Sequence, residues 1–198
     1  MNKIIHSLNL TKIYGEKETS VTALDDINVE FKENDFTAIM GPSGSGKSTL
    51  LHCLAGLDRP TSGQIYLREE DISTLNDKQL TKIRRDSFGF VFQAFNLIPT
   101  LTAEENITLP ASIAGRKPDM DWVKQVVDAV DIGDRLTHRP NELSGGQQQR
   151  VAAARAMATK PEVIFADEPS GNLDSKSSKE LLVFMKSVVD ELNQTIIM

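Results

Sequence analysis

The amino-acid sequence predicts an α/β fold with a mainly parallel core sheet. Strand-like segments alternate with helix-like segments along the 198 residues, as in folds whose helices cover a parallel sheet. Residues 163–166 form a short apolar run, which is typical of a buried central strand. The composition is 39% hydrophobic and 25% charged, which excludes disordered and collagen-like chains, so we expect one domain over residues 1–198.

The individual elements follow from the spacing of apolar residues. Residues 27–31 and 64–67 alternate apolar and polar, which predicts half-buried strands in the first third of the chain. Residues 122–130 and 181–192 place apolar side chains at helical spacing, so each predicts a helix with one apolar face. We interpret Trp122 and Met185 in these faces as core packing rather than as part of a cofactor site.

Charge and cysteine content exclude several classes of protein. The 22 basic and 28 acidic residues give a net charge of −6, so the field of the chain opposes binding to nucleic acid. The basic cluster at residues 78–85 is interrupted by acids and predicts a solvated helix face. The single cysteine, Cys53, indicates a reducing compartment, and no apolar run has the length of a membrane span or signal peptide. We therefore expect a location inside the cell.

A phosphate-binding loop lies between the strand-like residues 36–40 and a helix-like segment that starts near Thr49. It consists of Gly41, Pro42, Ser43, Gly44, Ser45, Gly46, Lys47 and Ser48. Glycines let the backbone curl so that its N–H groups and the helix N-terminus point at phosphate oxygens. Lys47 supplies a positive charge and Ser48 a hydroxyl ligand for Mg²⁺. Because such loops serve kinases, GTPases and ATPases, the motif predicts a ligand class but not a reaction.

Two carboxylates follow the apolar run at residues 163–166. Asp167 is suited to the Mg²⁺ shell, and Glu168 to accepting a proton from an attacking water. The alternative is an ordinary strand end before a turn at Pro169, which the presence of the phosphate-binding loop makes the weaker interpretation.

A second candidate anion site begins at Leu143. Ser144, Gly145, Gly146 and Gln147 precede an alanine-rich helix-like segment, so exposed N–H groups and the Ser144 hydroxyl can reach a phosphate. A simple capped helix explains Ser144 but not the two consecutive glycines.

With these motifs in this order, the sequence resembles the nucleotide-binding domain of ATP-binding-cassette (ABC) transporters over nearly its whole length. The resemblance implies that Tyr14 stacks on adenine and that Gln93 lies near Mg²⁺ and the attacking water. It also implies that Asp174 is the acid of the loop at residues 170–174. On their own, Tyr14 indicates a half-buried strand residue and Gln93 a surface amide.

The same resemblance implies an architecture. We expect a P-loop NTPase (RecA-like) core, an antiparallel β-subdomain built from the early strands, and a helical subdomain spanning about residues 94–139. Two copies are expected to pair head to tail, with each ATP between the P-loop of one and residues 143–147 of the other. Residues 56–63, 95–99 and 171–174 most resemble the macrolide-export and lipoprotein-release branch.

We therefore expect an ATP-hydrolysing subunit on the inner face of the cell membrane that drives a separate permease. Residues 94–110 are a candidate docking groove for that permease, although packing inside the helical subdomain explains them equally well. Two rival functions are a soluble ABC protein acting on ribosomes or DNA, and an ATP-binding module without turnover.

The family also has a histidine beyond the next core strand, which residues 195–198 resemble at its start. The histidines present, His6, His52 and His138, all precede Asp167, and we interpret them as structural or surface residues. The expectation is a shortened chain that hydrolyses ATP slowly.

Overall fold

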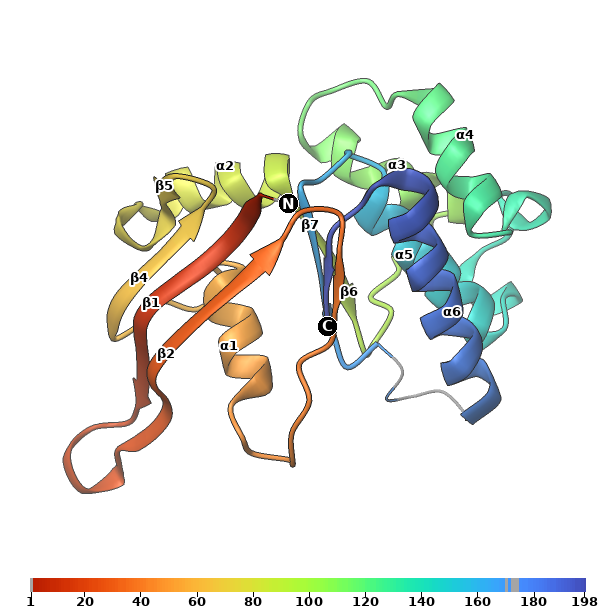
Figure 1. Cartoon of the computed structure of the whole chain (residues 1–198). Coiled ribbons are helices and arrows are strands. Elements are labelled where there is room, and N and C mark those ends of the chain that lie inside the picture. Colours follow the sequence, from red (N-terminus) through yellow and green to blue (C-terminus); the bar gives the residue numbers. More distant parts are fainter. Residues whose placement is uncertain (1, 170, 172–174) are drawn as a thin grey trace.

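The strands form two separate sheets (Figure 1). The structure is a computed structural model and describes residues 2–169, 171 and 175–198. The first sheet is antiparallel, with the strand order β2-β1-β4-β5. Its strands are β1 (Lys3–Tyr14), β2 (Val21–Lys32), β4 (Ser62–Leu67) and β5 (Glu70–Asp71). The strands predicted at residues 27–31 and 64–67 are confirmed as parts of β2 and β4.

The second sheet is parallel and lies at the centre of the molecule. Its order is β3-β8-β7-β6, with parallel pairing throughout. The strands are β3 (Phe36–Thr37), β6 (Phe88–Phe92), β7 (Val163–Asp167) and β8 (Ile196–Ile197). The predicted strand at residues 36–40 is regular only to Thr37, because its neighbour β8 is just two residues long. One further bond, from Ile39 N–H to the Met198 carbonyl (2.6 Å), continues the pairing.

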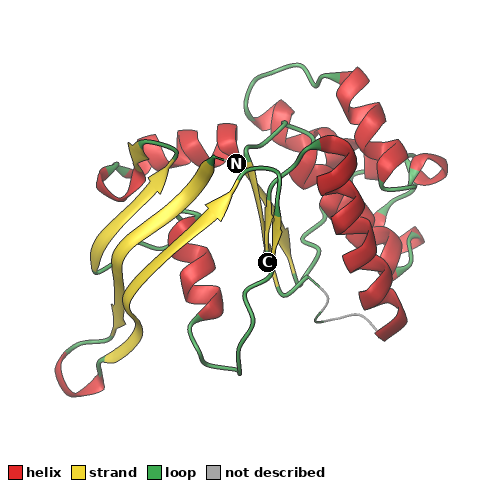
Figure 2. Ribbon diagram, in the orientation of Figure 1, coloured by secondary structure: helices red, strands yellow, loops and turns green. Residues whose placement is uncertain are grey.

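Helices cover both faces of the parallel sheet (Figure 2). They are α1 (Lys47–Leu54), α2 (Asp77–Ser87), α3 (Ala103–Ile113), α4 (Met120–Ala129), α5 (Gly145–Met157) and α6 (Ser175–Leu192). Side chains of Asn76, Thr102, Asp119 and Ser144 accept hydrogen bonds from backbone N–H groups at the helix starts, which satisfies donors that a helix leaves unpaired. The helix predicted at residues 122–130 is confirmed as α4 with its C-cap residue Val130, and the helix predicted at residues 181–192 is confirmed as part of α6.

The two faces of the parallel sheet support two hydrophobic cores. Ile164 and Ala166 point to a core shared with α3, α4, α5 and α6, whereas Val163 and Phe165 point to a core shared with α1, α2 and the antiparallel sheet. This alternation is the period of two along a strand. Met185 is buried in the first core, and Trp122 packs against it with its Nε1–H donated to the Met157 carbonyl (2.9 Å). Their interpretation as core residues is confirmed.

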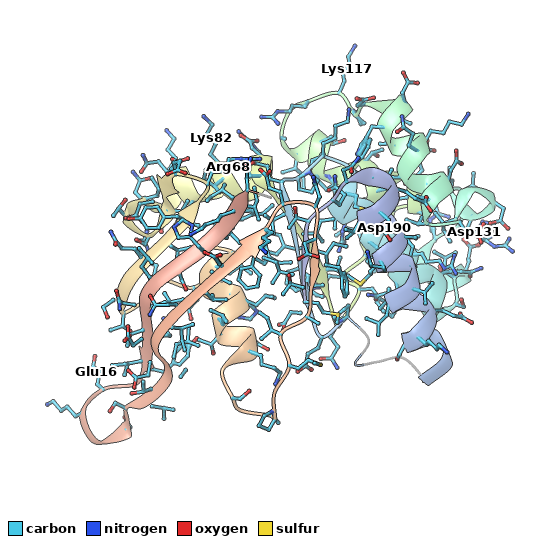
Figure 3. All side chains as sticks on the ribbon, in the orientation of Figure 1. Glu16, Arg68, Lys82, Lys117, Asp131 and Asp190 are labelled. Atoms are coloured by element: carbon cyan, nitrogen blue, oxygen red, sulfur yellow. The ribbon has the colours of Figure 1, made fainter. Side chains whose placement is uncertain are left out.

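Charged side chains lie on the outside of the molecule, around both hydrophobic cores (Figure 3). The residues labelled there are all exposed: Glu16, Arg68, Lys82, Lys117, Asp131 and Asp190. None of the helices in the described ranges combines the length and the apolar character that a membrane crossing requires.

The order of the parallel strands positions the candidate site. The carboxyl ends of parallel strands lie at one edge of a sheet, and loops at that edge are where open α/β sheets bind ligands. The segments that leave β3, β6 and β7 carry the P-loop, Gln93 and Glu168, respectively. The fold therefore brings motifs separated by more than a hundred positions to one edge.

Candidate functional site

The P-loop, residues 41–48, joins β3 to α1 and depends on two glycines with left-handed backbones. Gly44 has φ +78° and Gly46, the residue before α1, has φ +87°. A Cβ atom at Gly46 would also lie 2.5 Å from the carbonyl oxygen of Ala23. Because L side chains disfavour this backbone and the space is taken by main chain, residue 46 requires glycine.

Lys47 is the first residue of α1, and its ammonium group folds back over the loop. Its Nζ donates a hydrogen bond to the Pro42 carbonyl oxygen at 2.9 Å. This hydrogen bond holds the Lys47 ammonium against the backbone of the P-loop. The ammonium therefore lies at the N-terminus of α1, where the helix backbone already favours anions.

Asp167 ends β7 and receives two side-chain hydrogen bonds from α1. The Ser48 hydroxyl donates to Oδ1 at 2.9 Å, and His52 Nε2 donates to Oδ2 at 3.1 Å. The side chain of Asp167 is 26% exposed and that of His52 is 36% exposed. Sequence analysis missed this role of His52. The available signal was its spacing from Ser48, since residues four apart lie on the same face of a helix.

The oxygens of Ser48 and Asp167 suit a magnesium ion. Mg²⁺ prefers oxygen ligands at about 2.0–2.1 Å in octahedral geometry, in which neighbouring ligands are about 2.9 Å apart. The Ser48 Oγ to Asp167 Oδ1 distance is 2.9 Å, so these two atoms match one edge of such an octahedron. Mg²⁺ usually keeps several waters, so two protein oxygens are a sufficient anchor.

Glu168 directly follows Asp167 and is exposed, with φ +45°. A left-handed backbone at a residue other than glycine costs on the order of 1–3 kcal/mol, and nine other non-glycine residues in the described part of the chain also have a positive φ. Glu168 lines a cavity of about 250 Å³ together with residues of α1 and β7. The lining is Ile39, Lys47, Ser48, Leu51, Ala166, Asp167, Glu168, Pro169, Gly171 and Met198.

Gln93 follows β6 and reaches the rim of the same cavity. A Cβ atom at Gly171, one of the lining residues, would lie 2.7 Å from Gln93 Nε2. Gln93 is exposed, so its amide lies against the backbone beside Glu168 while open to solvent. Asp174, the other residue predicted near this edge, lies outside the described residues.

The second predicted anion site, residues 144–147, starts α5. The Ser144 hydroxyl oxygen accepts from the Gln147 N–H at 3.3 Å, and the Gln147 side-chain oxygen accepts from the Ser144 N–H at 2.9 Å. Cβ atoms placed at Gly145 or Gly146 would have open space around them in the described part of the chain. The start of α5 is therefore an open surface that a second body can approach.

Tyr14, predicted to stack on adenine, is the last residue of β1 and is 41% exposed. Its hydroxyl donates to Asp58 Oδ2 at 2.5 Å. The hydrogen bond to Asp58, followed by burial, raises the pKa of Tyr14 above its usual value. Thr49, one residue beyond Ser48, also interacts with the phenol, which brings Tyr14 to the first turn of α1.

The candidate docking stretch, residues 94–110, contains both a packed and an exposed apolar side chain. Leu97 packs against the core of the helical region, and the Asn106 amide bonds the Ile98 N–H and carbonyl oxygen at 2.7 and 3.2 Å. Ile98 itself is 41% exposed. Arg155 of α5 donates to the carbonyl oxygens of Phe95 and Asn96 at 2.9 and 2.5 Å.

A second cavity, of about 340 Å³, lies beside Asn96 and Pro110. Its lining includes three arginines, Arg84, Arg85 and Arg155, and the rings of β6. The expectation of a solvated face for residues 78–85 is thus only partly right: Lys78 and Lys82 are exposed, while Arg84 turns inward to donate to the Gly56 carbonyl.

Comparison with known proteins identifies the family. The family model described as ABC transporter matches residues 24–171. The macrolide export ATP-binding/permease protein MacB of Marinobacter nauticus is 47% identical over 181 residues, which are 90% of this chain and 28% of that protein. The lipoprotein-releasing system ATP-binding protein LolD of Geobacter metallireducens is 46% identical over 183 residues, 91% of this chain and 81% of that protein.

A solved structure supports the same assignment. It is a dimeric, post-hydrolysis state of an ATP-binding cassette bound to ADP and Pi, with a TM-score of 0.83 and 43% identity. The match covers 98% of this chain and 86% of that one. The predicted α/β fold and the predicted resemblance are both confirmed. The chain therefore belongs to the ABC transporter family and is an ATP-binding subunit of such a transporter.

Proposed function

We propose that this chain hydrolyses Mg²⁺-ATP, with Lys47 holding the phosphates, Asp167 and Ser48 holding Mg²⁺, and Glu168 acting as the base. The observation that carries the proposal is the shared cavity at the carboxyl edge of the parallel sheet. Lys47, Ser48, Asp167 and Glu168 all line it, so a phosphate chain, a cation and a proton acceptor fit within one small space.

Each residue has a separate task in this mechanism. The P-loop N–H groups and Lys47 bind and orient the phosphate oxygens. Mg²⁺, when bound, neutralises charge that develops on those oxygens. Glu168 accepts a proton from the attacking water on a carboxylate oxygen, a contribution of roughly 10²- to 10⁴-fold in rate. Gln93, at the cavity rim, helps to position that water.

Residues 144–147, the second candidate anion site, act on ATP that is bound to a second copy of the chain. The open start of α5 offers N–H groups and a hydroxyl proton to a phosphate, yet the cavity next to Lys47 is lined by residues of other segments. Head-to-tail pairing brings the start of α5 of one copy to the cavity of the other, so each copy completes the other's ATP site. Such twofold pairing is the commonest symmetry of soluble oligomers, and the solved relative described above is a dimer.

The proposed partner of the pair is a membrane permease, which also places the chain at the inner face of the membrane. The relative from Marinobacter nauticus is named as both an ATP-binding and a permease protein. We propose the second cavity and the neighbouring residues 94–110 as the contact. Exposed Ile98 supplies apolar surface there, and Arg84, Arg85 and Arg155 supply positive charge. A cysteine placed at Asn96 should cross-link to the permease that co-purifies, whereas one placed at Asp131 should not.

Steady-state phosphate release from Mg²⁺-ATP tests the proposed reaction. The wild-type chain should release phosphate continuously, and Glu168→Gln should bind ATP normally but release phosphate 10²- to 10⁴-fold more slowly, because an amide does not accept the proton. Equal rates for both chains would show that Glu168 is not the base. Binding without any turnover by the wild type would favour the rival, a binding module.

The other rival, an ABC protein that acts on ribosomes or DNA, is tested by co-purification. The proposed function predicts that the chain is recovered with membrane protein. Recovery with ribosomes instead would overturn the proposed partner while leaving the ATP site intact.

A further inference from the structure

Three side chains from two distant segments meet at the end of β1. The Tyr14 hydroxyl donates to Asp58 Oδ2 at 2.5 Å, and Lys12 Nζ donates to Asp58 Oδ1 at 2.6 Å. Lys12 also donates to the Arg59 carbonyl oxygen at 2.7 Å. Asp58 lies shortly after α1, the helix that starts in the P-loop. The triad therefore ties the end of β1 to the helix that carries Lys47.

Lys12 makes a further contact with the aromatic ring of Tyr14. Its Nζ is 4.7 Å from the ring centroid, within the range of a cation–π interaction. Only 12% of the Lys12 side chain is exposed, and 30% of that of Asp58. A lysine normally keeps its ammonium in water, so this one is unusually well fixed. The Lys12 ammonium therefore lies over one face of the ring, while 41% of the Tyr14 surface remains exposed.

Both hydrogen bonds to Asp58 hold in the charged form of the carboxylate. Burial raises the pKa of Asp58, but the hydrogen bonds from Lys12 and Tyr14 outweigh it and leave the pKa below its usual value. Asp58 is thus an acceptor for two donors at once, which fixes the Tyr14 hydroxyl and the Lys12 ammonium in one arrangement.

We infer that Lys12 and Asp58 are positioning residues that hold the Tyr14 ring in place as the platform for the adenine of ATP. The inference rests on the proposed function and on the stacking of Tyr14 on adenine, which the resemblance to the family implies. A ring that is already held in one rotamer loses little freedom when the base stacks on it, so affinity for the base is higher than with a mobile ring. The phosphates are held elsewhere, by the P-loop, and do not depend on the triad.

Asp58→Asn tests whether the triad affects binding of the adenine base and not binding of the phosphates. Asparagine keeps the shape but carries no charge and has one acceptor oxygen in place of two, so it cannot accept the charge-assisted hydrogen bonds from Lys12 and Tyr14 together. Calorimetry with Mg²⁺-ATP and with inorganic tripolyphosphate should show ATP affinity lowered about three- to tenfold, with tripolyphosphate affinity unchanged. Lys12→Met, which keeps much of the side-chain volume, should give the same pattern.

A matched control and an independent readout accompany these variants. Asp77 forms a neighbouring pair with Arg59 at 2.7 Å but is 91% exposed, and Asp77→Asn should change neither affinity. The chain has two tyrosines, so in a Tyr66→Phe background the absorbance titration reports Tyr14 alone. Because the hydrogen bond to Asp58 raises the pKa of Tyr14, Asp58→Asn should lower it.

Wild-type ATP affinity in both Asp58→Asn and Lys12→Met would overturn the inference. So would an equal loss of ATP and tripolyphosphate affinity, since the triad would then act through the P-loop. The proposed site fails separately: if Tyr14→Ala leaves ATP affinity unchanged, Tyr14 is not the platform. A loss with Tyr14→Ala and none with the two positioning variants would refute only the role of Lys12 and Asp58.

Discussion

The starts of α1 and α5 are two glycine-led helix N-termini with very different surroundings. At the start of α1, Ser48 bonds Asp167 at 2.9 Å and Lys47 lines a cavity with Glu168. At the start of α5, Ser144 and Gln147 bond each other, and Gly146 faces open space in the described part of the chain. Both helix starts offer backbone N–H groups to an anion. Proposed catalytic groups surround the start of α1, whereas the start of α5 is open. The difference indicates two halves of a composite site, to be joined between two copies.

Substitutions at the two helix starts should have very different effects on the affinity of a single chain for ATP. Lys47→Ala should weaken ATP binding by a single chain at least 10²-fold, because it removes the cation that lies at the phosphates. Ser144→Ala should leave that affinity within about twofold, since the start of α5 is not used by the same chain. Fluorescent ATP titration at low protein concentration measures both. Comparable losses in the two variants would contradict the assignment of the helix starts to different halves.

Glycine substitutions at the two helix starts should change the free energy of unfolding in opposite directions. Gly46→Ala should lower the free energy of unfolding by roughly 1–3 kcal/mol, because φ is +87° and the added Cβ would meet the Ala23 carbonyl at 2.5 Å. Gly145→Ala should raise it by about 0.5–1 kcal/mol, because Gly145 is helical in open space and alanine favours helix. Urea unfolding gives both values. A Gly46→Ala chain as stable as the wild type would show that the P-loop backbone is not constrained in this way.

A smaller effect on ligand binding than that of Lys47→Ala is expected at His52. His52→Ala removes the donor to Asp167 Oδ2, so the carboxylate is less well oriented, and we expect about a tenfold higher Mg²⁺ requirement for ATP binding. His138→Ala is the control, and ATP binding in EDTA should be unchanged in both. An unaltered Mg²⁺ midpoint for His52→Ala would mean that Ser48 alone orients Asp167.

Much of the fold was predictable because it follows local patterns. The apolar run ending in Asp167 and the helical stripe at residues 181–192 are each visible in a few consecutive residues, and both are confirmed. The loop from Gly41 to Ser48 was predictable for the same reason. Its detailed shape, with left-handed backbones at Gly44 and Gly46, agrees with what glycine permits.

The contacts that were not predicted join residues far apart in the chain. His52 and Asp167 are 115 positions apart, and Tyr14 and Asp58 are 44 apart. A sequence read alone does not show which strand edge faces which helix. The spacing of His52 from Ser48 indicates a shared helix face but not the partner Asp167, and the pair of Tyr14 and Asp58 has no local signature. The antiparallel β-subdomain implied by the resemblance is confirmed. The full length of β1 and β2 beyond residues 27–31 was not predicted, because the register shifts at several positions and interrupts the alternation.

Light scattering of the Glu168→Gln chain with and without Mg²⁺-ATP tests whether the two helix starts form one site between two copies. The chain has a mass of 21.9 kDa, and ATP should convert the monomer to a species of twice that mass. Ser144→Arg in the same background should bind ATP but remain a monomer, because a large side chain blocks the open start of α5. A dimer that forms equally well without ATP, or that survives Ser144→Arg, would contradict the account.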